Sequence, residues 1–569
     1  MELGNGRTRI GRIVGDPASG FRFQPEGGGE AIPLETISLV TFEGASPDPA
    51  AARPPFHALL GLGQRLSGRL VRVDPDEIRL EEGPGGKAVT LARGGVHALI
   101  QRPGEAQVLS EGFETLANDR WVRLGEPELV GEPKREGRMS LKLPAGGTSL
   151  TYSLVEPVGS GRLEIAFYDS GARAEGQRWF VDLTFRGSAA EHETIRAVLG
   201  WSEETLAVES PGGPALGIQP LARKPGWHRL VVRFDPKRTD LIVDGNELAH
   251  GQGPGGPLVE IRLASQTSGQ SPAPEGLAAY LDDLRLSRRV EPVGRMEVDP
   301  AQDEVRLVSG DQIFGQIQAA DPEHIILKMA GRSVTLGWAE VSGLYFRRAP
   351  AVSAPVEGLL VRADWRSAPG AEDRATDSIE GALIAASDAA FLLATPYAGT
   401  LTIPRDRMSR LQVLGRALRI IIDPTAHHLG DRDVPDLDPP HAEGTTLEIP
   451  FVLDQVPAGE ATLALDVVQV VGESGNPDFS DLVKDGQLRT VVRLNGQVLD
   501  AINRYIHDKN ETPERIRLPI PAGLLKPGRN HLRFEQTPTK ETTERFDNLG
   551  LLGTALEFAR GPDPEAPRP

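Results

Sequence analysis

Short runs of alternating apolar and polar residues follow one another along most of the chain, and clusters of Gly, Pro, Asp or Asn separate them. Alternation with a period of two is the pattern of strands that bury one face, and such clusters are typical of turns. The clearest turns are Asp244-Gly245 and Asn495-Gly496, because these dipeptides accept the positive φ angles of tight hairpins. The pattern predicts an all-β chain of many short strands.

One strand pattern of about forty residues occurs four times. Residues 59–80 align without a gap with residues 306–327, and further copies begin at residues 1–23 and 377–393. After every copy, a polar turn leads into one more apolar strand. A glycine inside the second strand of each copy indicates the strong bend of a small closed barrel. These glycines are Gly11, Gly68, Gly315 and Gly381. We expect four five-stranded barrels, at residues 1–45, 55–102, 303–348 and 356–415.

The repeat resembles the SH3-like and Sm-like small barrels, and its Gly turn, apolar-x-Gly strand and following Asp resemble the first Sm motif. Where Sm proteins carry an Asn that holds RNA, the copies carry Ile78, Ile325 and Ala390 or its neighbours. The basic-Gly pair of the second Sm motif has no consistent counterpart. The resemblance therefore implies structural barrels that act as spacers or docking surfaces, and not an RNA-binding ring.

The first copy begins in the middle of a strand, because Met1 aligns with Val305, where the third copy shows that strand complete. The start MELGNGRTRIGRIVGDP also lacks the apolar region of a signal peptide. We expect that Met1 is not the native start and that an export signal precedes it. The protein is then extracytoplasmic: at the cell surface, in the periplasm or secreted.

The segment 105–290 opens with GFETLANDRW and ends with AAYLDDLRLSR. Between them, GWHRLVVRFDPKRTDLIVDG resembles the laminin-G/concanavalin A-like jelly rolls, in which a Trp-His strand precedes an Asp-Gly hairpin and the last strand carries Asp-Asp. The matching residues are Trp227, Val232, Asp244, Gly245, Asp282 and Asp283. The resemblance implies two packed antiparallel sheets.

The segment 416–560 contains VVRLNGQVLDAI, ERIRLPIPAGLLKPGRNHLRFEQ and RFDNLGLLGTALEF. These motifs resemble the galactose-binding-like jelly rolls that accompany many carbohydrate-active enzymes. The resemblance implies a second β-sandwich, and sugar binding only as one of its uses. Residues 561–569, rich in Pro and charge, are expected to be a solvated tail.

Composition excludes several classes of protein. The chain of 569 residues has a net charge of −18 and no cysteine. Disulfide scaffolds, thiolate zinc sites, iron–sulfur clusters and cysteine nucleophiles are thereby excluded. The acidic balance argues against nucleic acid, which needs a basic footprint. No apolar stretch approaches the ~20 residues that span a bilayer.

Sequence motifs of catalysis are absent: the chain has no HExxH, Walker loop, GxSxG elbow or GxGxxG after a strand. Glycosidases with a concanavalin A-like fold carry paired carboxylates along one strand. The only near match is Glu297-Val298-Asp299, which lies in the linker after the jelly roll. We therefore predict that the chain is not an enzyme.

Calcium is the metal that the pattern favours, because jelly rolls often hold a hard cation where their first and last strands meet. The ligands there would be Glu114 with Asp282 and Asp283. The alternative to a calcium site is that Asp283 only caps a turn or accepts hydrogen bonds from backbone amides. A second acidic cluster in HHLGDRDVPDLDPPH is interpreted as a solvated loop, since prolines interrupt it; its aspartates are Asp431, Asp433, Asp436 and Asp438. His427 and His428 with His441 are a weaker metal set, because adjacent histidines in a strand point to opposite faces.

Aromatic side chains are the usual platforms for sugar rings. In the central jelly roll the candidates are Trp179 and Trp201, with most tryptophans expected in the core. In the C-terminal segment they are Tyr505 and His507, in the long polar loop NRYIHDKNETPE.

These observations predict a non-enzymatic, modular β protein of the bacterial envelope or exterior with a structural, adhesive or assembly role. Its partners would be further copies or other envelope proteins, joined through edge strands into a filament or lattice. The first alternative is a carbohydrate-binding accessory protein. The second is a glycoside hydrolase built on the central jelly roll.

Overall fold

The computed structural model is an all-β molecule, which confirms the predicted fold class. The described part of the chain contains one α-helix, α1 (Pro477–Lys484), and short 3₁₀ turns. The structure describes residues 10–26, 28–42, 55–102, 104–116, 121–135, 137–169, 177–187, 192–201, 205–209, 221–222, 224–267, 278–290, 301–347, 354–366, 376–434, 437, 439, 441–473, 477–508, 511–541 and 545–559. Met1, on which the prediction about the N-terminus rests, lies outside these residues.

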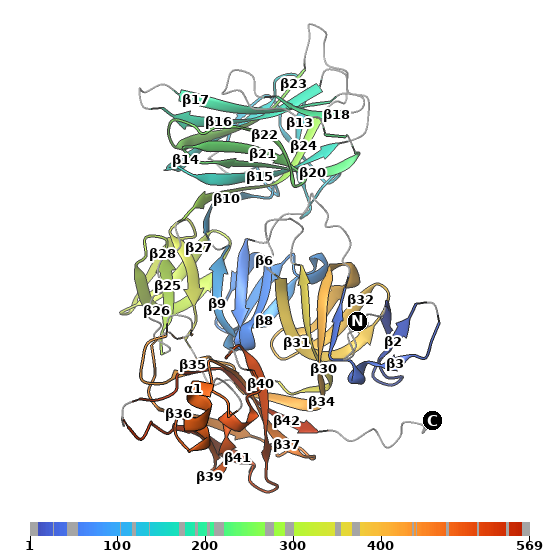
Figure 1. Ribbon diagram of the computed structural model, residues 1–569. Coiled ribbons are helices and arrows are strands. Elements are labelled where there is room, and N and C mark those ends of the chain that lie inside the picture. The colour runs from blue at the N-terminus through green and yellow to red at the C-terminus, as the bar shows by residue number, and fades with distance from the viewer. Residues whose placement is uncertain are drawn as a thin grey trace.

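A five-stranded antiparallel unit recurs along the chain (Figure 1). We number the four units 1 to 4 along the chain. In unit 2, each strand pairs with the next as far as the fourth, and the fifth strand returns to pair with the first. Its strands are β5 (Phe56–Leu60), β6 (Gln64–Val73), β7 (Glu77–Glu81), β8 (Val89–Ala92) and β9 (Val96–Gln101). Unit 3 has the same pairing in β25 (Asp303–Leu307), β26 (Gln312–Ala320), β27 (His324–Met329), β28 (Arg332–Gly337) and β29 (Val341–Tyr345). Unit 4 repeats it in β30 (Val356–Arg366), β31 (Thr376–Ala386), β32 (Ala390–Thr395), β33 (Gly399–Pro404) and β34 (Met408–Asp423).

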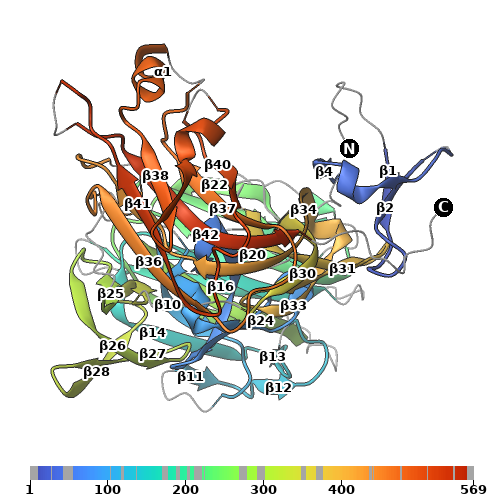
Figure 2. The ribbon, with the colours of Figure 1, turned by 90° about the horizontal axis from the view of Figure 1, so that it is seen from below.

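Unit 1 is described from residue 10 onward and comprises β1 (Gly11–Val14), β2 (Arg22–Pro25), β3 (Ile32–Pro33) and β4 (Leu39–Thr41). Figure 2 shows it at the rim of the molecule. The fifth strands join the units in pairs, since β4 pairs with β34 and β9 pairs with β29. Units far apart in the sequence are therefore neighbours: 1 with 4, and 2 with 3.

The glycine inside the second strand of each unit has a steric role. A Cβ atom there would lie 2.2 Å from the Gln24 carbonyl oxygen at Gly11, and 2.6 Å from that of Glu81 at Gly68. The distances at the other two positions are 2.7 Å for Gly315 and 2.3 Å for Gly381. The bent strand approaches the next strand too closely for any side chain, which explains the repeated glycine.

The central domain is a sandwich of two antiparallel sheets. The sheet that faces the units, here the junction sheet, has the order β12-β13-β24-β15-β20-β21-β22, with β10 beside β24. The second sheet, here the outer sheet, has the order β11-β14-β23-β16-β17-β18-β19. The junction strands are β10 (Glu105–Glu111), β12 (Glu128–Val130), β13 (Ser140–Pro144), β15 (Gly161–Asp169), β20 (Gly226–Phe234), β21 (Arg238–Val243), β22 (Asn246–Gln252) and β24 (Ala278–Arg289). The outer strands are β11 (Trp121–Leu124), β14 (Ser149–Val158), β16 (Gln177–Arg186), β17 (His192–Trp201), β18 (Thr205–Glu209), β19 (Leu221–Ala222) and β23 (Leu258–Thr267).

The C-terminal domain is a second sandwich. One sheet has the order β36-β41-β38-β39, and the other is built around β42, which pairs with β35, β37 and the end of β34. Its strands are β35 (His427–Leu429), β36 (Thr446–Leu453), β37 (Ala461–Val468), β38 (Thr490–Leu494), β39 (Gln497–Ala501), β40 (Glu514–Ile520), β41 (Gly528–Gln536) and β42 (Leu549–Ala559). The expected boundary at 415/416 falls inside β34, which belongs to unit 4 at one end and to this sandwich at the other.

Charged and polar side chains lock the domains together. Arg93 of unit 2 contacts Asp303 of unit 3 at 2.9 Å. Ser67 of unit 2 donates to Asp377 of unit 4 at 2.6 Å. Glu380 of unit 4 contacts Arg515 of the C-terminal sandwich at 2.8 Å. All of these carboxylates are buried, so the units and the C-terminal sandwich pack against one another.

Candidate functional site

The two outer surfaces of the central sandwich have different surroundings. The junction sheet faces the barrel units, whereas the outer sheet lies on the far side of the domain (Figure 1). The core between them is apolar, because alternate residues of each strand point inward. The alternate residues of each strand that point away from the core decide what each surface can bind.

The outer sheet carries a cluster of Arg196, Asp182, Arg262 and Phe180, here the outer-sheet cluster. Strand pairing places Asp182 of β16 directly opposite Arg196 of β17 and opposite Arg262 of β23. Arg196 donates two hydrogen bonds to Asp182, of 2.6 and 2.8 Å, in a bidentate fork. Arg262 approaches the same carboxylate at 4.0 Å.

Phe180 lies beneath the two guanidinium groups. The Arg196 guanidinium is 4.4 Å from the centre of the ring, and that of Arg262 is 5.7 Å from it. Val198 and Ala264 flank the ring and are buried with it. The arginines are thus held by a carboxylate and by an aromatic face at the same time.

The cluster keeps hydrogen-bonding capacity for a ligand. The Arg196 and Arg262 side chains are 34% and 37% exposed, while that of Asp182 is 6% exposed. The hydrogen bond to Asp182 raises the pKa of Arg196, which keeps that group charged. Two cations share one carboxylate, so the cluster has an excess positive charge and fixed N–H donors.

Alternation along RWFVDLTFR explains the arrangement. Trp179, Val181, Leu183 and Phe185 point into the core, so Phe180 and Asp182 point outward. Sequence analysis missed the cluster because it looked for tryptophans and paired acids. The signal was present in the alternation: an aromatic and a carboxylate share one face of a strand whose opposite face is wholly apolar.

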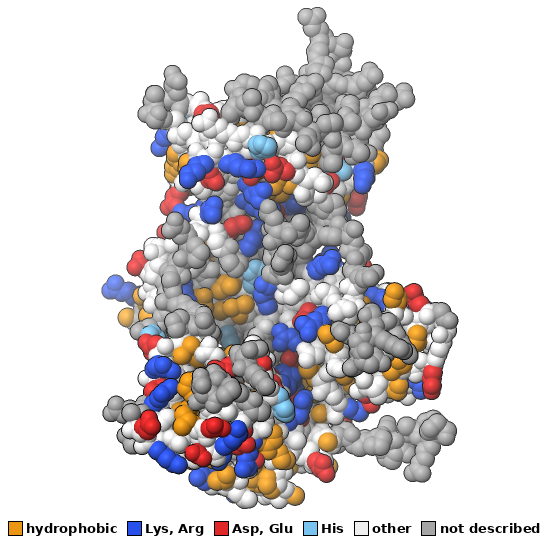
Figure 3. All heavy atoms as spheres, in the orientation of Figure 1, with side chains coloured by type: hydrophobic (Ala, Val, Ile, Leu, Met, Phe, Trp, Pro, Cys, Tyr) orange, Lys and Arg blue, Asp and Glu red, His pale blue; other side chains and the backbone are white. Residues whose placement is uncertain are grey.

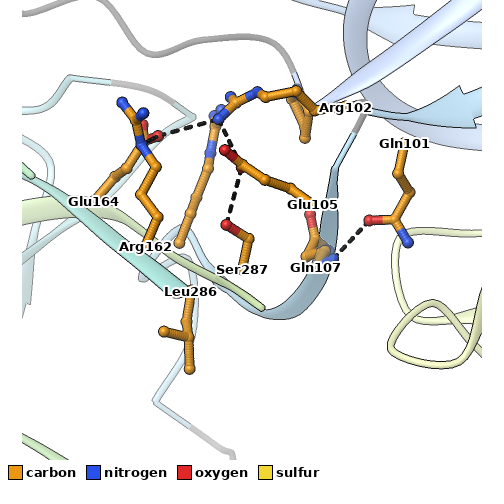
Figure 4. A pocket seen from close by; sticks show the side chains of 10 residues that line it. Gln101, Arg102, Glu105, Gln107, Arg162, Glu164, Leu286 and Ser287 are labelled. Carbon is orange, nitrogen blue, oxygen red and sulfur yellow. Dashed lines mark hydrogen bonds and ion pairs between the residues drawn. The ribbon is translucent and has the colours of Figure 1, made fainter. Parts of the chain in front are cut away.

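The junction sheet carries a buried network around Glu164 (Figure 4). Arg162 of the same strand contacts Glu164 at 2.5 Å, and Arg102 of unit 2 contacts it at 3.3 Å. Burial raises the pKa of Glu164, but Arg162 and Arg102 overcome this effect and hold it well below its ordinary value. Arg102 also contacts Glu105, whose carboxylate accepts a hydrogen bond from Ser287. This network attaches the central sandwich to unit 2.

The predicted calcium ligands take part in internal contacts. Glu114 accepts a hydrogen bond from the Arg138 amide at 2.7 Å, and Asp282 accepts one from the Arg135 amide at 2.8 Å. Asp283 pairs with Arg229 at 2.6 Å and with Arg285 at 2.6 Å. Pairing between β15 and β24 is irregular beside Asp282 and Asp283, and Asp283 has a φ of 45°.

Within the described residues, no group of three or more His, Cys, Asp or Glu side chains is arranged to hold a metal ion. Calcium at Glu114, Asp282 and Asp283 therefore stays a prediction. Of the second acidic cluster, Asp436 and Asp438 lie outside the described residues.

The predicted glycan platforms are spread over different environments. Trp179 is 1% exposed and packs against Phe167, with ring centres 5.1 Å apart, so it offers no face to a sugar. The side chain of Trp201 lies outside the described residues. Tyr505 is partly buried and donates to Asp500 at 3.1 Å, while His507 is exposed beside Glu514. Trp179 lies in the core of the central sandwich and Tyr505 in the C-terminal sandwich, so the structure does not bring these two side chains together.

His427 is the centre of an internal charge cluster. Its Nε2 lies 3.0 Å from Asp423, and its Nδ1 lies 3.0 Å from Glu443. Burial lowers the pKa of His427, but these two carboxylates raise it to about 9. The ring is therefore held as a cation between two acids.

No family model matches this chain, and no curated protein matches its sequence. Several solved structures are similar to part of it. The Crh5 transglycosylase is 13% identical, with 34% of this chain and 90% of that chain covered and a TM-score of 0.24. SCLam, a non-specific endo-β-1,3(4)-glucanase from family GH16, is 10% identical, with 34% and 96% covered and a TM-score of 0.24. A protein of unknown function with a galectin-like fold from Bacillus subtilis is 12% identical, with 33% and 99% covered and a TM-score of 0.25.

The likeness concerns a jelly-roll fold over about a third of the chain. The two packed antiparallel sheets predicted for the central segment are confirmed by the structure itself. The assignments to the laminin-G and galactose-binding families, and the SH3/Sm likeness of the units, stay predictions.

The prediction that the chain is not an enzyme was wrong. The solved structures that are similar to about a third of it include a glucanase and a transglycosylase. The absence of a familiar sequence motif does not exclude catalysis, because paired carboxylates can come from different strands. No helix in the described part of the chain has the length and apolar character to cross a membrane.

Proposed function

We propose that this protein binds carbohydrate through the outer-sheet cluster. The observation that carries the proposal is the bidentate pair of Arg196 with Asp182, set over Phe180 and beside Arg262. This function was the first alternative from the sequence, and it replaces the structural and assembly role as the main interpretation. An extracytoplasmic location is part of the same proposal.

Sugar hydroxyl groups need several donors and acceptors in fixed positions. A free arginine loses side-chain entropy when it binds, whereas Arg196 is already oriented by Asp182 and by the Phe180 ring. Its remaining N–H groups, and those of Arg262, can donate to hydroxyl or ring oxygens. Threonine hydroxyls lie one row further along the same face, at Thr184 opposite Thr194.

The test is a glycan array with the full chain, followed by calorimetric titration of the oligosaccharide that binds. Loss of a charged hydrogen bond costs about 1.5–3 kcal/mol, so Arg196→Ala should weaken binding roughly 10- to 100-fold. Arg196→Lys should also weaken it, because lysine has no planar fork. The matched control is Arg416→Ala, which removes a 34% exposed arginine of unit 4 that pairs with Glu35 of unit 1.

Unchanged affinity in Arg196→Ala and Arg262→Ala would contradict this site. The predicted site at Tyr505 and His507 is compared in the same series with Tyr505→Ala. Mass spectrometry of the oligosaccharide after incubation shows in parallel whether the bound glycan is also cleaved.

A further inference from the structure

The four barrel units form one row across the molecule, in the order 3, 2, 4 and 1 (Figure 1). Fifth strands make the contacts at the two ends of the row, between units 3 and 2 and between units 4 and 1. Units 2 and 4 meet in a different way, through the second strands β6 and β31, and this interface is here the middle contact. Within the described residues, no other unit pairs with the start of β26, which is the second strand of unit 3.

The middle contact joins equivalent residues of the two units. Arg65 of β6 lies directly opposite Ser378 of β31. Each is three positions before the glycine of its own bent strand, Gly68 or Gly381. A contact in which a position meets its own counterpart has local two-fold symmetry, which is the symmetry of two identical copies in a dimer.

Two reciprocal hydrogen bonds flank this pair. The Ser67 amide donates to Asp377 at 3.0 Å, and the Glu380 amide donates to the Gln64 side chain at 2.8 Å. Both donors are one position before the glycine of their strand, and both acceptors are four positions before it. The same set of positions on each unit therefore supplies both halves of the interface.

The fourth strands β8 and β33 complete the middle contact, because they lie against each other. The Ala92 amide of unit 2 donates to the Tyr397 carbonyl oxygen of unit 4 at 2.8 Å. Val89 and Leu401 hold equivalent positions on the two fourth strands, and both are buried. Units 2 and 4 thus cover each other's apolar fourth strand.

Unit 3 has the same surface, but there it is exposed. Phe314 holds the position of Ser67, and Val334 holds that of Val89 in the register of the fourth strand. Ser67 and Val89 are buried, whereas Phe314 and Val334 are 37% and 36% exposed. Figure 2 shows β28, which carries Val334, at the rim of the molecule, and Figure 3 shows hydrophobic side chains at the surface along the level of the row. Apolar side chains that are exposed at interface positions indicate a partner.

We propose that two copies of this chain associate through unit 3, in the two-fold arrangement of the middle contact. Phe314 and Val334 of each copy are then covered by the other copy. Asp311 stands where Asp377 stands in unit 4, so it accepts a hydrogen bond from the Phe314 amide of the second copy. The association does not depend on carbohydrate binding.

The partner surface in the second copy is unit 3 and not unit 1, which stands at the other end of the row. Unit 1 carries Arg7 four positions before Gly11, and a guanidinium group donates hydrogen bonds but accepts none. Unit 1 therefore cannot supply the acceptor that Asp311 supplies. Unit 3 supplies the donor and the acceptor alike, so two copies of it satisfy both reciprocal hydrogen bonds.

The experiment is sedimentation of the full chain over a range of concentrations, and we expect a dimer whose fraction rises with concentration. Phe314→Glu should be monomeric, because it places two carboxylates in an interface that excludes water. The matched control is Ile326→Glu, at a 38% exposed position of β27 in the same unit, which should dimerise as the wild type does. Its counterpart in unit 2, Arg79, stays exposed beside the middle contact, so this position lies outside the interface. Circular dichroism verifies that both variants are folded.

A second test uses the absence of cysteine from the chain. Gln312 is three positions before its glycine, as Arg65 and Ser378 are, so it faces its own counterpart across the two-fold axis. Opposite residues of antiparallel strands have Cα atoms about 4.5–5.5 Å apart, which is within the span of a disulfide. Mild oxidation should therefore link Gln312→Cys into a covalent dimer and leave Ile326→Cys monomeric in denaturing electrophoresis.

A wild-type chain that stays monomeric at every concentration would disprove the proposal, and so would a Phe314→Glu variant that still dimerises. Equal cross-linking of Gln312→Cys and Ile326→Cys would also overturn it, since it shows random collision and no fixed interface. Ile10→Glu changes the exposed residue before the glycine of unit 1. Loss of association in this variant would overturn the pairing of two copies of unit 3, in favour of a row that continues from unit 3 of one copy to unit 1 of the next.

Discussion

Leu99 of β9 lies directly opposite Leu344 of β29, and both side chains are fully buried. Val40 of β4 lies opposite Leu411 of β34 in the same way. The repeat alignment makes all four residues equivalent positions of the fifth strand. Each pair of units therefore meets around the same point, as two subunits do about a two-fold axis.

This pairing predicts that Leu344→Ala destabilises the protein strongly. The substitution should leave a cavity where two barrel cores meet and cost about 2–5 kcal/mol of unfolding free energy. Urea denaturation measures the loss. Val334→Ala, on the partly exposed face of β28, is the control and should cost less than about 1 kcal/mol. Equal losses of unfolding free energy in the two variants would show that the interface between the barrels contributes no more to stability than an exposed strand position.

Stability should decrease as the pH rises from 6.5 to 9, because of His427. Its pKa is about 9 in the folded protein, against an ordinary value of 6.5. A raised histidine pKa stabilises the fold below the ordinary value, and this gain is lost as the pH rises through 9. The contribution is about 2–3 kcal/mol. In His427→Gln, the midpoint of thermal unfolding should be lower than in the wild type at pH 6. It should also change less with pH between pH 6.5 and 9.

The control for this variant is His250→Gln, an exposed histidine beside Glu247. Its pH profile should follow that of the wild type. A His427→Gln profile that keeps the full alkaline decrease would show that other groups cause it.

Asp377 should add a second decrease at lower pH. Burial raises its pKa to about 6, although Ser67 donates to it. An acid with a raised pKa binds more protons when folded than when unfolded, so stability falls as the pH rises from about 4 through 6. Asp377→Asn should flatten this part of the profile and change the unfolding free energy at pH 7 by up to about 3 kcal/mol. Scanning calorimetry at several pH values, with exposed Asp388→Asn as control, tests this.

Glu380 is expected to couple unit 4 to the C-terminal sandwich. Arg419 contacts it at 2.7 Å and Arg515 at 2.8 Å. Burial raises the pKa of Glu380, but Arg515 and Arg419 hold it below its ordinary value, so the pairing is lost only as the pH falls below about 4.5.

Glu380→Gln removes the buried carboxylate that Arg419 and Arg515 share and leaves Asp466 as the acid that both still contact, so it should cost about 3–5 kcal/mol. Scanning calorimetry should then show separate transitions for the two domains. The exposed pair of Glu35 with Arg416 offers a control, since Glu35→Gln should cost less than about 1 kcal/mol. A single, unshifted transition in Glu380→Gln would argue against the coupling.

Local pattern was enough to predict strands, turns and the repeat, since these depend on neighbours in the sequence. The bend at Gly68 could be predicted too, because the same steric demand within one hairpin occurs in every copy. The sequence did not show which strands of different units pair with each other. Nothing near Leu99 indicates that its neighbour is residue 344, since every copy offers the same apolar fifth strand.

The candidate site was missed for a related reason. Trp179 and Phe180 are adjacent aromatic residues, and only the direction of the strand decides that the tryptophan is buried and the phenylalanine faces outward. The partners Arg196 and Arg262 come from two other strands, and their convergence on Asp182 depends on sheet register. The boundary inside β34 was hidden likewise, because one continuous strand serves two domains.

The chain enters and leaves the central sandwich through adjacent strands, with Glu105 of β10 opposite Arg289 of β24. Since β9 and β29 hold units 2 and 3 together just outside this point, the barrel frame closes without the sandwich. The central sandwich is thus an inserted domain, and the pairing of β9 with β29 fixes the two points at which the chain enters and leaves it. Its surfaces can be exchanged or redesigned while the frame keeps its hydrogen bonding. A replacement has to reproduce the ion pairs of Arg102 and the contacts of Arg285 with Glu82 and of Arg288 with Ala339.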